Sequence, residues 1–240
     1  MSFNLSCLLI LLFCLEGSFA HAAKPLRIAT FPIPLMVESE SKGIFISLTR
    51  EIAKRSKVEV QIEVWPTAKT LLDFSTNKVD AFFPALEVFA PKQASRTASF
   101  YTKVDFVFST KGKNLNTLKD LEGKKVGLTF RYPYVKELTQ NKKIDFEFAD
   151  DDVTNMKKLA LGTIDAFVVE ERSGLQALSL SGQTNIQYNK DKPLSKQDVF
   201  YAFQDNEEGK GMVELFNRAI ESMRKDGTFD RLMNQDPSKN

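Results

Sequence analysis

Cysteine and histidine are almost absent from this chain of 240 residues. The two cysteines are Cys7 and Cys14, and the single histidine is His21. The sequence after His21 therefore has no thiol and no imidazole, which excludes triads of serine, histidine and aspartate, cysteine-histidine catalysis, and zinc sites built from thiolates or several histidines. Disulfides are excluded as well, so the fold must depend on its hydrophobic core. We expect neither a metal nor another cofactor.

Long apolar runs are missing too. The run at residues 5–15 is too short to span a bilayer, and a small-x-small cleavage motif follows it at 20–22, with 18–20 as the alternative. No Lys or Arg precedes the run, which departs from the usual pattern. We predict a signal peptide at 1–22 and therefore a periplasmic protein; an uncleaved membrane anchor is the alternative.

Charge of one sign does not dominate. Once the predicted signal is removed, 33 basic residues face 30 acidic ones, a net charge of +3. The lysines and arginines are scattered among the acids and form no basic stripe of the kind that binds nucleic acid. We expect no nucleic-acid partner.

Strand and helix patterns alternate along the mature chain. Apolar or alternating runs at 26–31, 58–65 and 79–84 predict strands, and apolar residues at helical spacing in 44–57 and 67–76 predict helices. This β-α-β-α-β order is typical of a mostly parallel sheet covered by helices.

The same order recurs in the second half. Strands are predicted at 124–130, 144–148 and 164–169, and helices at 134–140 and 152–161. The phrase KVDAFFPALE (78–87) has a near-copy in TIDAFVVEE (163–171), and each falls on the third strand of its own unit. The repeat predicts two lobes of similar build.

Two further strands connect the units. KVDFVFST (103–110) leads into the second unit, and QDVFYAFQ (197–204) leads out of it toward a helical tail with an apolar face at 212–223 and a short helix near 229–233. We expect the tail to pack on the first lobe, so the chain crosses twice and forms a two-strand hinge. The predicted lobes are 23–106 with 203–240, and 107–202.

Four segments resemble the family-3, or type II, extracytoplasmic solute-binding proteins. In order they are NKVDAFFPALEVFAPKQASRTASFYTK, LKDLEGKKVGL, LALGTIDAFVVEE and MVELFNRAIESMRKDGTFDRLMN. The resemblance implies two α/β lobes, each a mostly parallel sheet flanked by helices, joined by two hinge strands and closing on a ligand. It implies a monomer that binds a small polar solute, an amino acid or related small carboxylate, for an ABC importer.

The resemblance also implies ligand-binding positions. An arginine that grips the ligand carboxylate in the family's amino-acid binders is matched here by Lys92, which lacks the bidentate fork of arginine. The hydroxyl-bearing positions before it read Ala85, Glu87 and Phe89. The aspartate that binds the ligand ammonium is matched by Glu170.

A second cation opens the second lobe. Arg131 lies in TFRYPY, which begins at Thr129, and its place between a strand end and a helix N-terminus suits anion binding. Tyr132 stands where the family has a hydroxyl residue. Either Lys92 or Arg131 then binds the carboxylate, with Thr129 and Tyr132 or Tyr134 in the pocket, or the ligand is no α-amino acid.

Two aromatic residues complete the predicted cleft. Trp65 precedes a proline at a strand end, and Phe31 begins the turn Phe-Pro-Ile-Pro, where rigid prolines suit a preformed wall. Core packing is the alternative for Trp65.

The charged positions have structural alternatives. Lys92 can be solvated, Glu170 can cap the next helix, and Arg131 can pair with the acidic run at 150–152, which is itself a helix start.

Two other functions remain open beside solute transport. One is a sensory module that docks on a membrane receptor. The other is a dehydratase-like enzyme with Glu87 and Glu170 as acid and base. We expect no enzyme, because a fold does not fix a function and no catalytic set is evident.

Overall fold

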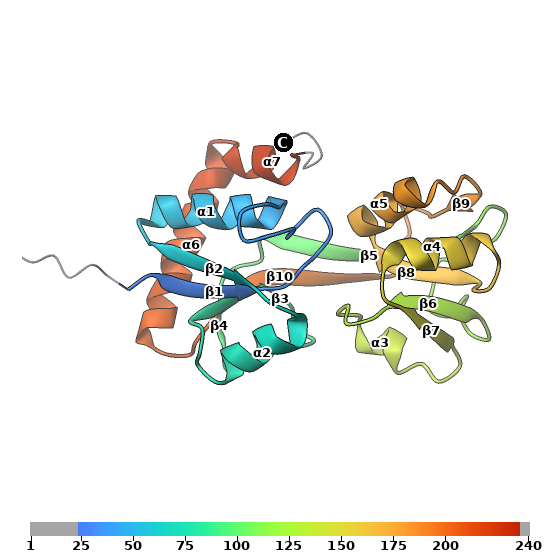
Figure 1. Cartoon of the computed structure of the whole chain (residues 1–240), viewed down its shortest axis with the longest axis horizontal. Helices are drawn as coiled ribbons and strands as arrows, with labels where there is room; N and C mark the ends of the chain where they lie inside the picture. Colours follow the sequence, from blue (N-terminus) through green and yellow to red (C-terminus); the bar gives the residue numbers. More distant parts are fainter. Residues whose placement is uncertain (1–23, 236–240) are drawn as a thin grey trace, which may run out of the picture.

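A computed structural model describes residues 24–235 (Figure 1). The predicted signal peptide, with both cysteines and the histidine, lies outside the described residues. The described chain is an α/β protein with strands and helices gathered at either end of two long strands, β5 (Tyr101–Thr110) and β10 (Ser195–Phe203). This arrangement confirms the predicted fold class of two α/β lobes joined by two strands.

The first lobe is built on three parallel strands. Its elements are β1 (Leu26–Thr30), α1 (Ile44–Ser56), β2 (Val60–Val64), α2 (Thr67–Ser75) and β3 (Ala81–Ala85). β1 lies between β2 and β3 and pairs with both in parallel. The elements form where the sequence predicts them because the apolar positions of the pattern are the buried ones; α1, for example, buries Ile44, Leu48 and Ile52.

The second lobe repeats this order. Its elements are β6 (Lys125–Thr129), α3 (Lys136–Thr139), β7 (Asp145–Ala149), α4 (Asp152–Ala160) and β8 (Ala166–Glu170). β6 lies between β7 and β8, again in parallel. α3 is shorter than the predicted helix at 134–140 because Tyr134 is held in the core instead. The Tyr134 hydroxyl accepts a hydrogen bond from the Thr129 N–H (2.9 Å) and donates one to the Val168 carbonyl (3.1 Å).

A further helix, α5 (Glu171–Ser181), follows β8. The sequence pattern did not define it, since its apolar face is weak. It packs closely on β5, and Gly174 permits this contact because a Cβ there would lie 2.6 Å from the ring of Phe108. The helix therefore sits directly behind the end of β8, where Glu170 begins it.

The two long strands carry the connection between the lobes. All strands form one sheet in the order β2-β1-β3-β10-β5-β8-β6-β7, with the short strands β4 (Ser95–Arg96) and β9 (Ile186–Gln187) pairing β10 and β5. β10 pairs with β5 from Ser195 to Val199 and with first-lobe β3 from Phe200 onward. β5 in turn pairs with second-lobe β8 from Asp105 to Ser109, so both long strands run between the lobes.

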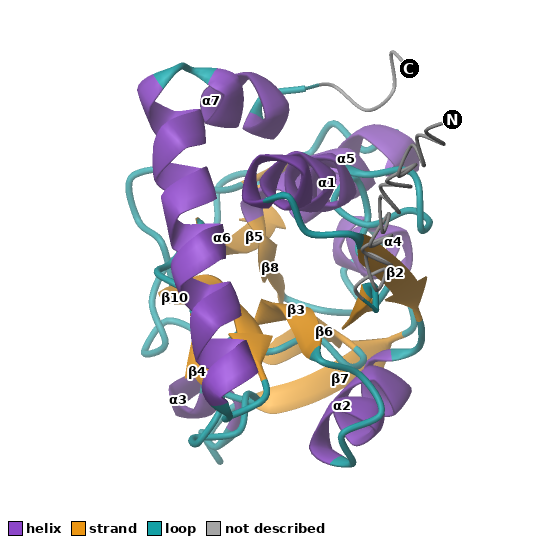
Figure 2. Cartoon of the chain, turned by 90° about the vertical axis from the view of Figure 1, so that its left-hand side faces the viewer, coloured by secondary structure: helices purple, strands orange, loops and turns teal. Residues whose placement is uncertain are grey.

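The helical tail packs on the first lobe, as predicted. It consists of α6 (Glu207–Lys225) and α7 (Thr228–Met233), which contact α1 and each other (Figure 2). α6 buries Phe216, Ala219, Ile220 and Met223 in the first-lobe core. The buried apolar residues of the second lobe form separate clusters of their own, around Phe167 and around the β6 strand. Each lobe therefore has its own core. Within residues 24–235, no helix is long and apolar enough to cross a membrane.

Candidate functional site

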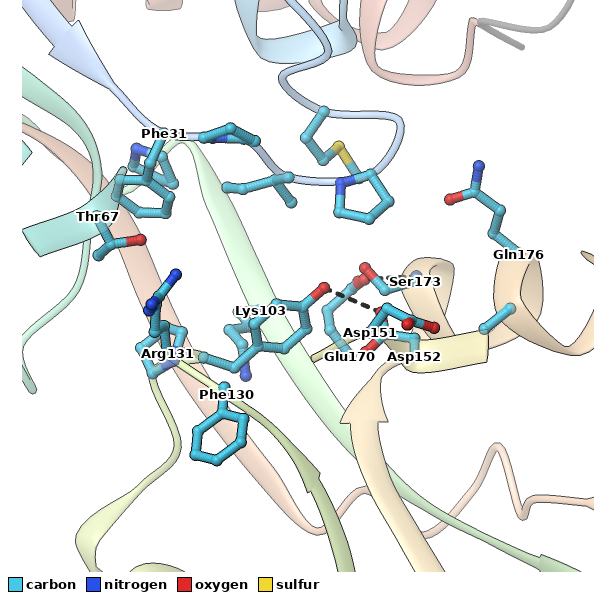
Figure 3. Close-up of a pocket in the computed structure, with 18 of the residues that line it drawn as sticks. Phe31, Thr67, Lys103, Phe130, Arg131, Asp151, Asp152, Glu170, Ser173 and Gln176 are labelled. Carbon is cyan, nitrogen blue, oxygen red and sulfur yellow. Dashed lines mark hydrogen bonds between the residues drawn. The ribbon is translucent and has the colours of Figure 1, made fainter. Parts of the chain in front are cut away.

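A cleft of about 550 Å³ lies between the two lobes and is floored by the hinge strands (Figure 3). The first lobe lines it mainly with apolar side chains, among them Phe31, Ile33, Met36 and Leu86. The second lobe lines it mainly with charged and polar residues, among them Arg131, Tyr132, Asp152 and Glu170. Tyr101, Lys103 and Val199 line it from the hinge strands. The volume is in the range of pockets that bind small molecules.

Arg131 lies at the cleft, directly beyond the end of β6. Its backbone is left-handed, with φ at 66°, a conformation that non-glycine residues rarely adopt and that is common at functional sites. Its side chain is exposed and forms no hydrogen bond or ion pair with any other residue in 24–235. The alternative pairing with the acidic run at 150–152 is therefore not formed, and the guanidinium is available to a ligand.

The loop that carries Arg131 is tied to the hinge. The side-chain amide of Gln197, in β10, donates a 2.8 Å hydrogen bond to the carbonyl of Pro133. On its other side, the loop is held by the core contacts of Tyr134. The position of Arg131 is thus fixed by both the hinge and the second-lobe core.

Asp152 is a buried carboxylate in the cleft wall. It accepts hydrogen bonds from the Thr129 hydroxyl (2.5 Å) and the Tyr132 hydroxyl (2.9 Å). Burial raises the pKa of Asp152 above its ordinary value, although both hydrogen bonds act in the opposite direction. Burial, together with the neighbouring carboxylate of Asp152, also raises the pKa of Tyr132. Thr129 does not line the cleft itself; it holds Asp152 from behind.

Glu170 lines the cleft and also begins α5. One of its carboxylate oxygens accepts a hydrogen bond from the Tyr101 hydroxyl (2.7 Å), and the other accepts one from the Ser173 N–H (3.0 Å). The alternative of a helix cap is confirmed. The two roles are compatible, because a carboxylate has about four acceptor positions and only two are used here.

Lys103 is a cleft residue that the sequence analysis missed. It is 8% exposed and forms an ion pair with buried Asp105, which also accepts a hydrogen bond from the Ser195 hydroxyl (2.8 Å). The ammonium of Lys103 lies 5.4 Å from the ring centre of Tyr134. The signal was present in the alternation of KVDFVFST, since positions two apart on a strand share a face.

Several predicted positions lie away from the cleft lining. Lys92 is exposed on the loop after β3 and does not line the cleft. Glu87 is exposed and forms an ion pair with Arg96, so it does not meet Glu170 across the cleft as an acid–base pair requires. Ala85 is fully buried in the first-lobe core.

The two predicted aromatic residues differ. Phe31 lines the cleft. Trp65 is 37% exposed and lies neither in the core nor in the lining; its indole N–H donates to Glu63 (3.1 Å), and the ammonium of Lys69 lies 4.3 Å from the ring centre. The indole is therefore held by Glu63 and Lys69 rather than by the cleft. The next residue in the chain, Pro66, does line the cleft.

Comparison with known proteins agrees with this architecture. The sequence description of the bacterial extracellular solute-binding proteins, family 3, matches residues 27–235. The L-cystine-binding protein TcyJ of Escherichia coli K12 is 28% identical over 195 residues, which cover 79% of this chain and 72% of that protein.

Two solved structures illustrate the shared fold. The ligand-binding core of GluR0 from Nostoc punctiforme, in complex with (L)-glutamate, has a TM-score of 0.72 at 19% identity, covering 87% of this chain and 97% of that one. A histidine kinase sensor domain with similarity to periplasmic binding proteins has a TM-score of 0.71 at 18% identity, covering 88% of this chain and 94% of that one. Since the family description spans almost all of the described residues, this chain belongs to the bacterial extracellular solute-binding proteins of family 3.

Proposed function

We propose that this protein binds an amino acid or a related small carboxylate in the cleft, in the periplasm, and delivers it to an ABC importer. The observation that carries the proposal is the cleft itself, which lies between two separately cored lobes joined by two strands, with the guanidinium of Arg131 available inside it. The name of TcyJ, an amino-acid-binding protein, supports a ligand of this class. The proposed lobes are those predicted from the sequence, hinged at β5 and β10, and the protein acts as a monomer.

Closure of the two lobes completes the contacts that bind the ligand. Neither lobe alone surrounds a ligand in the cleft, so the full set of contacts forms only when the lobes approach each other. A ligand can shift the equilibrium toward the closed form only by the difference between its affinities for the two forms. A group of one lobe that faces the cleft, such as Arg131, can hold the ligand before closure.

Arg131 is the proposed carboxylate anchor, in place of Lys92. It lines the cleft, whereas Lys92 does not. Its planar guanidinium can donate two parallel hydrogen bonds to a carboxylate. On the other side of the ligand, Glu170 keeps acceptor capacity for an ammonium group.

A sensory role is the second candidate. The likeness to a histidine kinase sensor domain favours it, since the same two-lobed module serves there. Ligand binding is common to both candidates. They differ in the partner that reads the closed form, a permease or a membrane receptor.

A thermal-shift panel tests the proposed function. The chain without its predicted signal is heated with amino acids, polyamines, dicarboxylates and aromatic acids. A ligand at 1,000 times its dissociation constant adds about 4 kcal/mol to the stability of the folded protein. The melting temperature should then rise by several degrees, about 2–4 °C per kcal/mol for a chain of this size. If no amino acid or small carboxylate raises it, the proposed function fails.

A further inference from the structure

The first-lobe face of the cleft has no charged side chain among the described residues that line it. Four of its lining positions are prolines, Pro32, Pro34, Pro66 and Pro84. A proline has no N–H group, so these positions cannot donate a hydrogen bond to a ligand carboxylate. Apolar side chains occupy most of the remaining positions, and Thr67 is the only polar side chain among the described residues of this lobe that line the cleft.

Two backbone donors in the turn after β1 are already used within the first lobe. In the turn after β1, the N–H of Ile33 donates to the carbonyl of Val37 (3.0 Å), and the N–H of Met36 donates to the carbonyl of Pro34 (2.8 Å). The charged first-lobe positions suggested by the resemblance, Glu87 and Lys92, lie outside the lining. The side chains of the first lobe therefore offer a ligand mainly apolar contact.

The second-lobe face carries charges of both signs. Arg131 is drawn well apart from Asp151, Asp152 and Glu170 in Figure 3, so the cationic and acidic parts of this face are separated. Lys103 adds little to the cationic part, because Asp105 neutralises it. A ligand with only a carboxylate would leave the acidic part of the cleft without a partner, and a ligand with only an amine would leave Arg131 without one. Charges removed from water need such partners.

We propose that polar recognition in this cleft resides in the second lobe, and that the ligand is an amino-acid-like zwitterion with an apolar body. Its carboxylate binds Arg131, its ammonium lies toward Glu170 and Asp152, and its apolar body contacts the first-lobe wall of Phe31, Met36 and Leu86. This inference rests on the proposed function and narrows its ligand class. The second lobe captures the ligand by charge, and the first lobe closes over it as an apolar cover.

The test is calorimetric titration of the chain without its predicted signal. The probes are L-phenylalanine, L-leucine and L-methionine, together with 3-phenylpropionate, which lacks the ammonium, and 2-phenylethylamine, which lacks the carboxylate. L-serine and L-glutamate serve as polar amino acids. At least one of the three apolar amino acids should bind, and loss of either charged group should weaken binding at least about tenfold.

Three variants locate the polar contacts. Arg131→Gln should weaken binding of the apolar amino acid at least about tenfold, whereas the matched Lys92→Gln should stay within about twofold of the wild type. Thr67→Val, which removes the first-lobe hydroxyl, should stay within about threefold. Circular dichroism confirms that each variant is folded.

The outcomes separate this inference from the proposed function. Binding of L-serine or L-glutamate without any of the three apolar amino acids overturns the inference but leaves the proposed function intact. Loss of binding in Lys92→Gln or Thr67→Val, with Arg131→Gln unchanged, overturns it in the same way. Silence with every amino acid and small carboxylate removes the proposed function, and this inference with it.

Discussion

The hydroxyl of Tyr101, at the start of β5, donates a 2.7 Å hydrogen bond to the carboxylate of Glu170, at the end of β8. The bond joins a hinge strand to the residue that both lines the cleft and begins α5. Burial, followed by the neighbouring carboxylate of Glu170, raises the pKa of Tyr101, so the phenol keeps its proton and remains a donor at neutral pH. The orientation of Glu170 thus depends on the hinge.

Replacement of this hydroxyl gives the first prediction. Tyr101→Phe should lower the free energy of unfolding by about 1.5–3 kcal/mol, the usual contribution of a buried hydrogen bond to a charged group. Ligand affinity should fall as well, because Glu170 loses the contact that orients it. Urea unfolding and calorimetric titration measure the two effects.

Tyr188→Phe is the matched control for this variant. Tyr188 donates a 2.8 Å hydrogen bond to Glu171, the neighbour of Glu170, and does not line the cleft. Its loss should leave ligand affinity unchanged, because neither Tyr188 nor Glu171 lines the cleft. Equal loss of affinity in both variants would mean that Tyr101 acts only on the stability of the second lobe.

The architecture was predictable from the sequence because burial follows periodicity. The alternation in 103–110 and 197–204 predicted the two hinge strands, and the repeated phrase at 78–87 and 163–171 predicted the two third strands. A helix after Glu170 was considered, but the extent of α5 was not predicted because Gly174 and the serines around it weaken the apolar pattern, although close packing on Phe108 requires that glycine.

The site was predictable only in part, since sequence position does not give the direction of a side chain in a loop. Arg131 and Lys92 read alike as cations that follow a strand, yet only Arg131 lines the cleft. The left-handed backbone at Arg131 and the hydrogen bond from Gln197 to Pro133 determine this orientation, and both depend on contacts between distant parts of the chain.

The second prediction concerns Arg131→Gly, which should weaken ligand binding without lowering the stability of the fold. A left-handed non-glycine residue costs about 1–2 kcal/mol. Glycine removes that cost but loses about 0.5–1 kcal/mol in chain entropy on folding. The variant should therefore be as stable as the wild type or up to about 1.5 kcal/mol more stable, because the Arg131 side chain forms no hydrogen bond or ion pair within 24–235 that could be lost. Ligand binding should nevertheless fall at least about tenfold.

Lys57→Gly is the control for backbone relief alone. Lys57 is an exposed residue that ends α1 in the same left-handed conformation, with φ at 56°. Its replacement should change the free energy of unfolding by a similar amount and leave ligand binding unaltered. If Arg131→Gly binds as tightly as Lys57→Gly does, the guanidinium is not the carboxylate anchor.

Two adjacent aspartates give the third prediction, with opposite dependence on pH. Burial raises the pKa of Asp152 above its ordinary 3.8, whereas hydrogen bonds from Thr154 lower the pKa of Asp151 below the same value. A raised carboxyl pKa means that the folded state holds the proton more tightly than the unfolded state. Asp152 therefore destabilises the fold progressively as the pH rises from 3.8 through its raised folded value. Asp151 has the opposite sign: its contribution is present above pH 3.8 and is lost as the pH falls through its lowered folded value.

Asparagine replacements at the two positions measure these signs in one experiment. Relative to the wild type, Asp152→Asn should gain stability as the pH rises above 3.8. Asp151→Asn should lose stability relative to the wild type as the pH rises toward 3.8, and the difference should stay constant above that pH. Urea unfolding of the three proteins between about pH 2.5 and 7 covers both windows. Each variant is compared with itself across pH, so that the fixed cost of changing the side chain cancels. Parallel profiles for the two variants would show that Asp152 is ionised at no cost in the fold. The carboxylate of Asp152 would then be as accessible to water as a surface carboxylate, and the hydroxyls of Thr129 and Tyr132 would not bury it.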